Sequence, residues 1–261
     1  MLNDEYQELR QTVEAFARDV VAPVIGDFYE REEFPYDVVR QMGAMGLSAC
    51  RSPEEYGGMG GDYFALCLPL EELARVDSSV AITLEAAVFA RRDAIPVRHR
   101  RTARGVAAQA GHRRDAGRAF GLTEPGGGSD VPGGMRTTAR ARRPRMGDQT
   151  GRRRSSRTRG TDTSRRRRRG RADRRAGDLH DLVPSGTPGS RCRSSTPKVG
   201  WNASDTRELS FTDCRVPRRQ PCWAERAAAT RSSCRPSTRP RPRSRAIGVG
   251  LAQGCVDECL R

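Results

Sequence analysis

Apolar residues at the start of the chain follow the spacing of a helix with one buried face. Over residues 3–22 they lie three or four positions apart, as in an amphipathic helix. The positions that form this stripe are Leu9, Val13, Phe16 and Val20. Asn3 can cap the first turn, because its side-chain oxygen can accept a free backbone N–H there. Pro23 should end or kink the helix, since proline has no backbone N–H to donate.

Three more helical segments are predicted before residue 89. The first follows Pro35, and its inward apolar positions are Val38, Val39, Met42 and Met45. A glycine-dense loop over 53–61 separates it from helical segments at 62–75 and 79–88. Pro69 lies inside the first of these two segments, where a proline costs about 3 kcal/mol. The first 88 residues therefore predict a well-patterned helical unit.

Beyond residue 88, patterned and unpatterned stretches alternate. Neither helical nor alternating spacing is found in three arginine-rich stretches, which are 89–118, 141–180 and 218–245. Strands are expected at 135–140 and 208–212, where the sequence has the character of extended chain. Helical spacing returns at 246–261. The pattern thus predicts helices, then strands, then one more helix.

The charge of the chain changes at the same place as its pattern. Residues 1–88 hold 6 basic and 17 acidic side chains, whereas the whole chain has a formal net charge of +16. Of its 48 basic residues, all but Lys198 are arginine, which is far above ordinary usage. The stretch 141–180 holds 16 arginines and 4 aspartates. We expect it to be irregular or poorly determined, because it has few apolar side chains to offset the entropy cost of ordering it.

Several classes of protein are disfavoured by this sequence. No apolar run approaches the roughly 20 residues that a membrane-spanning helix needs. The acidic N-terminus does not have the pattern of a secretory signal. The eight cysteines are widely spaced and form no Cys-x-x-Cys pair, which argues against a disulfide framework and against a zinc site. We therefore expect a cytoplasmic protein with no metal ligands.

The most informative segment runs Leu122-Thr-Glu-Pro-Gly-Gly-Gly-Ser-Asp130. It has the pattern of a strand end, a Pro-Gly turn, further glycines and a hydroxyl. Because glycine has no Cβ, its backbone N–H can approach a ligand closely, and such a loop suits a phosphate or another electron-rich group. From spacing alone, a purely structural turn is the simpler alternative.

The residues of this segment closely resemble a signature of the acyl-CoA dehydrogenases. Further blocks are similar to the same family in the same order: 4–10, 53–58 and 71–79 to its first domain, 198–217 to its β-domain, and 246–260 to the first helix of its C-terminal bundle. The resemblance implies an α+β fold with an N-terminal helical domain, a middle β-domain and the start of a C-terminal helical bundle. The expected bounds of these three parts are 1–118, 119–217 and 218–261.

The resemblance also implies a cofactor, a reaction and partners. Members of this family are FAD-dependent oxidoreductases of fatty acid metabolism. They convert an acyl-CoA to the trans-2-enoyl-CoA, pass electrons to an electron-transfer flavoprotein and are typically homo-oligomers. Carried over to this sequence, the family's FAD contacts fall on Phe120, Leu122, Thr123, Gly126, Gly127, Gly128 and Ser129. Ser129 is also expected to approach the acyl-CoA substrate.

The resemblance supplies no catalytic residue for this chain. In the family a glutamate removes the α-proton of the acyl-CoA. The stretch 236–243, where some relatives carry that glutamate, contains none, and Glu124 belongs to the flavin-loop motif. Nothing in 141–180 matches the family's second flavin-binding strand, and the chain ends in the first helix of the bundle. We therefore expect the chain as written not to oxidise acyl-CoA.

Two other interpretations address the arginine-rich stretches. One is nucleic-acid binding, because arginine-rich arms neutralise phosphates. The three stretches lack lysine and nearly lack aromatic residues that would stack on bases, which counts against this interpretation. The other, which we favour, is a non-functional gene product: a GC-rich gene translated in the wrong frame yields arginine, proline and glycine with almost no lysine. Retranslation of the coding DNA in the other frames distinguishes the two.

Overall fold

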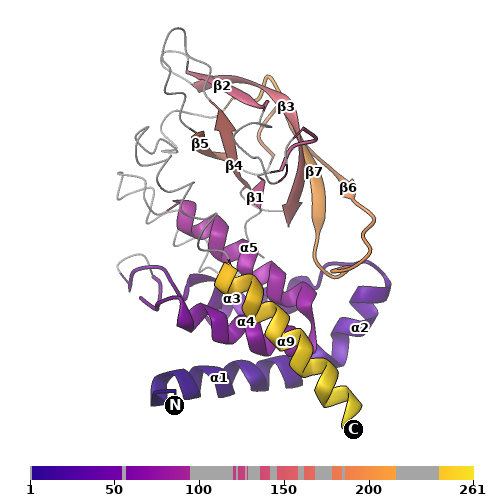
Figure 1. The fold of residues 1–261 in the computed structure, drawn as a ribbon. Coiled ribbons are helices and arrows are strands. Elements are labelled where there is room, and N and C mark those ends of the chain that lie inside the picture. The colour runs from indigo at the N-terminus through magenta and orange to yellow at the C-terminus, as the bar shows by residue number, and fades with distance from the viewer. Residues whose placement is uncertain are drawn as a thin grey trace.

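The computed structural model describes residues 2–54, 57–94, 120–121, 123–126, 128, 136–141, 146–157, 162–167, 178–183, 186–215 and 241–261. Its helices gather in one part of the molecule and its strands in another, and the last helix returns from the strands to the helical part (Figure 1). An α+β fold with an N-terminal helical part and a sheet is confirmed. The predicted domain bounds at 118 and 217 lie outside the described residues.

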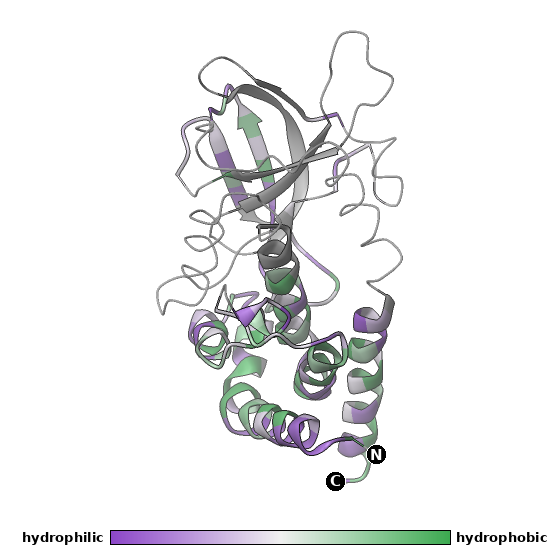
Figure 2. Cartoon of the chain, turned by 90° about the vertical axis from the view of Figure 1, so that its left-hand side faces the viewer, coloured by the Kyte–Doolittle hydropathy of each residue, from purple (hydrophilic) through white to green (hydrophobic). Residues whose placement is uncertain are grey.

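The helical part consists of six α-helices and two short helical turns among the described residues. In chain order they are α1 (Asp4–Phe16), the π-helical turn η1 (Ala17–Val21), α2 (Ala22–Glu30), α3 (Tyr36–Ala44), the 3-10 turn η2 (Leu47–Ala49), α4 (Phe64–Val76), α5 (Ser78–Ala94) and α9 (Arg241–Cys259). Figure 2 shows apolar stretches on the helices of this part, where they face one another.

The first predicted helix is present, but Pro23 does not end it. Asn3 caps α1 as expected, because its Oδ1 accepts the N–H of Tyr6 at 2.9 Å. The π-helical turn η1 follows without a break, and Pro23 lies in the first turn of α2. A proline is tolerated there, since the first N–H groups of a helix have no partner within it. Of the two outcomes expected at Pro23, an end or a kink, the end is not observed, because helical chain continues to Glu30. A kink agrees with the structure, since α1 and α2 run in different directions (Figure 1).

The other N-terminal helices are confirmed. In α3, Val38, Val39 and Met42 are buried as predicted. In α4, Pro69 lies inside the helix and is itself buried. Burial of a leucine side chain contributes about 1.5–3 kcal/mol. The buried leucines of α4, which are Leu66, Leu68, Leu70 and Leu73, can therefore offset the cost of the proline.

The strands form one sheet of seven. They are β1 (Phe120–Gly121), β2 (Thr138–Ala141), β3 (Met146–Arg157), β4 (Asp162–Arg167), β5 (Asp178–Val183), β6 (Ser190–Ser195) and β7 (Thr206–Thr212). The order across the sheet is β1-β4-β2-β3-β7-β6, and β5 pairs with β4. The parallel pairs are β1 with β4 and β2 with β4, and the others are antiparallel.

Over 141–180, where irregular or poorly determined chain is expected, the structure describes residues 141, 146–157, 162–167 and 178–180, and these are not irregular. The rest of the stretch lies outside the described residues. Residues 146–157 and 162–167 lie in strands, and 178–180 begin a third. The reason is that ladder hydrogen bonds join backbone groups and do not require apolar side chains. The register shows this, because β3 pairs along most of its length with the well-patterned β7.

At two glycines of α9, the backbone lies directly against the backbone of α4. A Cβ added at Gly250 would lie 2.1 Å from the carbonyl oxygen of Glu71 and 2.9 Å from the Cβ of Ala74. A Cβ added at Gly254 would lie 2.2 Å from the carbonyl oxygen of Arg75. No side chain fits at such distances, so both positions require glycine for the two helices to pack as they do.

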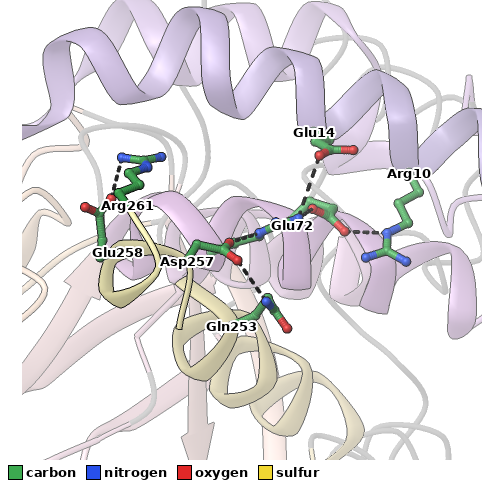
Figure 3. Close-up of polar contacts among 8 residues, drawn as sticks. Arg10, Glu14, Glu72, Gln253, Asp257, Glu258 and Arg261 are labelled. Carbon is green, nitrogen blue, oxygen red and sulfur yellow. Dashed lines mark hydrogen bonds and ion pairs between the residues drawn. The ribbon is translucent and has the colours of Figure 1, made fainter. Parts of the chain in front are cut away.

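A chain of ion pairs joins the same two helices to α1 (Figure 3). Glu72 of α4 is almost fully buried, and its Oε1 accepts the Nε–H of Arg10 at 2.5 Å. The guanidinium of Arg75 lies 3.6 Å from the other oxygen of Glu72 and also donates to Asp257 of α9. The hydrogen bond from Arg75 lowers the pKa of Asp257, and a second from Gln253 acts in the same direction. The charge of Glu72 is thereby balanced inside the helical part.

The helical part meets the sheet at α5. The segment before β7 inserts Ala203 into the helical core, and the buried Oγ of Ser204 lies 3.2 Å from the Oγ1 of Thr83. Asp77 caps α5 by accepting the N–H of Val80 at 2.9 Å, and burial raises the pKa of this carboxyl. The far end of α5 packs beside β1 and β4 (Figure 1). This helix therefore sets the position of β1 relative to the helical core.

Within the described ranges, no helix combines the length and the apolar character that crossing a bilayer would need. The same ranges contain no cluster of three or more His, Cys, Asp or Glu side chains that could hold a metal ion.

We predict that Gly250→Ala and Gly254→Ala each lower the free energy of unfolding by about 1–3 kcal/mol, because a methyl group forces α9 away from α4. Gly248→Ala is the matched control, since a Cβ there meets nothing within 4 Å. It should raise stability by about 0.5–1 kcal/mol through the helix preference of alanine. Urea unfolding of the three variants measures the difference. Equal effects at all three positions would contradict the close contact.

Candidate functional site

The candidate site begins where β1 ends. Phe120 and Gly121 pair in parallel with Thr163 and Ser164 of β4, and Gly121 is buried. The glycine-rich segment that the sequence singled out follows β1 in the chain, with Glu124 in a β-bridge and a turn at Pro125 and Gly126. A strand that ends beside a helix presents the following turn at the edge of the sheet, which is where a ligand can reach it.

The structure describes four of the seven predicted flavin contacts. Phe120 lies in β1, and Thr123, Gly126 and Gly128 lie after it, all three exposed. A Cβ built at Gly128 would meet nothing within 4 Å, so the space beside it is open. The other three predicted residues lie outside the described residues, and they are Leu122, Gly127 and Ser129.

Glu124 points the opposite way from its exposed neighbours. Its side chain is only 5% exposed, and its carboxylate accepts two backbone N–H groups that precede β2. The N–H of Arg136 donates to Oε2 at 2.6 Å, and the N–H of Thr137 lies 3.2 Å from each oxygen. Sequence reasoning placed Glu124 in the motif without a role. The signal available was a carboxylate inside a turn, because turn N–H groups lack ladder partners and need acceptors.

These residues fit an FAD molecule. An exposed threonine hydroxyl can hydrogen-bond to the polar edge of a flavin ring. Gly126 and Gly128 carry no side chain over their exposed backbone, and the open space at Gly128 leaves room for a pyrophosphate. The carboxylate of Glu124, an acidic residue of the segment, is bound by the two N–H groups that precede β2.

A second group of polar residues is buried between α5 and α9. Arg243 is fully buried, and its Nε lies 3.6 Å from Oε1 of Glu85. Its guanidinium carbon also lies 5.9 Å from the ring centre of Tyr63, and that of Arg51 lies 3.6 Å from the same ring. Arg243 belongs to the stretch 236–243, where the resemblance led us to look for a glutamate. At the C-terminal end of this stretch the structure has Arg243 instead, and this arginine is paired with Glu85.

Two cysteines of the helical part, Cys50 and Cys67, are not activated as nucleophiles. Burial raises the pKa of the Cys50 thiol to about 12, so it stays protonated at neutral pH. Burial also raises the pKa of Cys67. Since a thiolate is the reactive form of cysteine, neither residue has the environment of a catalytic thiol.

Known proteins match the chain both in sequence and in fold. Residues 3–94 match the N-terminal domain of the acyl-CoA dehydrogenases. A protein of Mycobacterium leprae named probable acyl-CoA dehydrogenase fadE25 is 42% identical over 81 residues, which cover 31% of this chain and 21% of that protein. The mitochondrial short-chain specific acyl-CoA dehydrogenase of Rattus norvegicus is 31% identical over 230 residues, which cover 83% of this chain and 53% of the rat protein.

Residues 3–94 therefore belong to the acyl-CoA dehydrogenase family as its N-terminal domain. The fold of the chain agrees with this assignment, because butyryl-CoA dehydrogenase from Megasphaera elsdenii matches all of it with a TM-score of 0.89 at 22% identity, over 69% of that chain. An acyl-CoA dehydrogenase complexed with FAD from Bacillus anthracis matches 96% of this chain with a TM-score of 0.84 at 23% identity, over 43% of its own length.

A further match is a chain in the structure of the electron transferring flavoprotein of Acidaminococcus fermentans. The two chains match over 97% of this chain and 67% of that chain, with a TM-score of 0.87 at 25% identity. The chain spans a fifth to about half of the two relatives compared by sequence. The activity of a whole acyl-CoA dehydrogenase is therefore a proposal for this chain.

We predict that Gly128→Val leaves the free energy of unfolding within about 0.5 kcal/mol of the unsubstituted protein, because its side chain would project into open space. The same substitution should weaken FAD binding by about tenfold or more, since the valine occupies space beside the loop backbone. Gly200→Val is the control, as an equally open glycine before β7. Fluorescence titration of FAD measures the affinities, and equal affinity for both variants would remove Gly128 from the site.

Proposed function

We propose that this chain binds FAD as part of an acyl-CoA dehydrogenase, which converts an acyl-CoA to the trans-2-enoyl-CoA. The observation that carries the proposal is the exposure of Thr123, Gly126 and Gly128 after β1, in the family's characteristic sequence. Family membership supports the reaction, and the open space beside Gly128 supports the cofactor.

Each residue of the segment has a proposed role. The hydroxyl of Thr123 hydrogen-bonds to the polar edge of the flavin ring, with the backbone N–H of Leu122 beside it. The backbone from Gly126 to Ser129 binds the pyrophosphate, and Ser129 also approaches the acyl-CoA. When bound, FAD supplies the acceptor for the hydride that leaves the β-carbon of the acyl chain.

The α-proton requires a base, and the described residues offer none that we assign. Glu124 is held by two backbone N–H groups, and Glu85 is paired with Arg243. Each of these carboxylates is thus held by a group of this chain, and we assign neither of them as the base. We therefore propose that this chain by itself binds the cofactor without completing the reaction.

The proposed partners follow from the same family. Electrons would pass to an electron-transfer flavoprotein, and the structural match in the Acidaminococcus fermentans flavoprotein supports this choice. We further propose a homo-oligomer located in the cytoplasm. No observation on the described residues favours nucleic-acid binding, and the wrong-frame origin of the arginine-rich stretches stays a prediction.

We predict that the purified chain gains visible flavin absorbance when FAD is added, and that Thr123→Val weakens this binding by about tenfold, as for one lost hydrogen bond to a ligand. Thr123→Ser should retain the affinity, because it keeps the hydroxyl. Thr12→Val, at an exposed position of α1, is the control. Dye-coupled assays with acyl-CoA should give no turnover. Absence of flavin binding would contradict the proposed function, and turnover would show that a base is present.

A further inference from the structure

Among the described residues of the glycine-rich segment, Glu124 alone is buried, and its role is not to contact a ligand directly. Its neighbours Thr123, Pro125 and Gly126 are exposed, whereas its own side chain is buried. A buried carboxylate is costly unless donors surround it. The cost is offset here by the N–H groups of Arg136 and Thr137, which both point at the same carboxylate.

The contact joins two points that lie far apart along the chain. Glu124 comes directly after the exposed Thr123, and Arg136 and Thr137 lead directly into β2. The carboxylate of Glu124 therefore links the start of the glycine-rich segment to the start of β2. Hydrogen bonds from N–H groups to a carboxylate are about twice as strong as those between neutral groups, so this link holds its geometry.

Thr137 offers a control for this contact, because its hydroxyl takes no part in it. Thr137 is fully buried, and its Oγ1 has no hydrogen-bond partner in the described structure. Glu124 binds the backbone N–H of Thr137 and not its hydroxyl. Its hydroxyl can therefore be removed without disturbing the contact.

We propose that Glu124 is a positioning residue for the flavin loop: its carboxylate joins the start of the glycine-rich segment to the start of β2 and so fixes the direction in which Thr123 and the glycines face. The proposal rests on the proposed function, because it names what that loop binds. A preformed loop binds its ligand without an ordering cost, and loss of the contact transfers this cost to binding.

Four substitutions separate this role from simple space filling. Glu124→Ala removes both the acceptor and the volume, and Glu124→Met keeps the volume without an acceptor. Glu124→Gln keeps one oxygen, which can still accept both N–H groups as Oε2 does in the structure. Thr137→Val is the matched control, because it retains the backbone N–H.

Two measurements on the full chain read the contact independently. Amide hydrogen exchange at Arg136 and Thr137, without FAD, reports whether the carboxylate holds the two N–H groups. We expect exchange about tenfold faster in Glu124→Ala and Glu124→Met, an intermediate effect in Glu124→Gln, and no change in Thr137→Val. FAD affinity, measured by flavin fluorescence, should weaken in the same order.

The outcomes separate the two proposals. Unchanged exchange in Glu124→Ala overturns the contact itself. Faster exchange with unchanged FAD affinity overturns the positioning role, and a Glu124→Met protein that behaves like Glu124→Gln shows that the side chain acts through its volume. If the unsubstituted protein does not bind FAD, both the proposed function and the role of Glu124 in FAD binding fail. The exchange rates still decide whether Glu124 holds the N–H groups of Arg136 and Thr137.

Discussion

The packing of α9 against α4 is the contact on which the helical part depends, because it brings residues 241–259 back against residues 64–76. Two glycines allow the backbones to approach, and the ion pair from Arg75 to Asp257 joins the same helices. Close packing of this kind excludes water, and Leu66, Leu70 and Leu73 of α4 are fully buried. The polar and apolar parts of the interface thus act together. Close approach shields Glu72, and the arginines balance its charge.

The candidate site is positioned by this core through α5. That helix contributes buried residues to the helical core, contacts Ser204 before β7, and reaches β1 at its other end. The glycine-rich segment therefore starts from a strand whose place is determined by packing. After β1, the segment is held by polar contacts, in which Glu124 binds the N–H groups that precede β2. A ligand loop that combines an apolar foundation with charge-assisted hydrogen bonds can stay exposed and still keep its geometry.

Local patterns in the sequence predicted what local physics controls. Helical spacing located the N-terminal helices and α9, and alternation located β7, because each follows from burial of one face. At Pro23 the sequence predicted an end or a kink, and the helical chain changes direction without ending, since a π-helical turn upstream places the proline where it is tolerated. The strands at 146–157 and 162–167 could not be foreseen from side chains, because their partners are backbone groups of distant strands. The same holds for the site. Its glycines were visible in the sequence, but the partners of Glu124 lie beyond the loop.

The central claim is that α4 and α9 form one cooperative unit although they lie far apart in the sequence. Native-state hydrogen exchange in increasing denaturant tests it most directly, because it measures the free energy of opening for each helix separately. If the claim holds, the slowest amides of α9 around Gly250 and Gly254 open with the same free energy and denaturant dependence as those of α4 around Leu70 and Leu73. Opening of α9 at a clearly lower free energy, with α4 still protected, would contradict it.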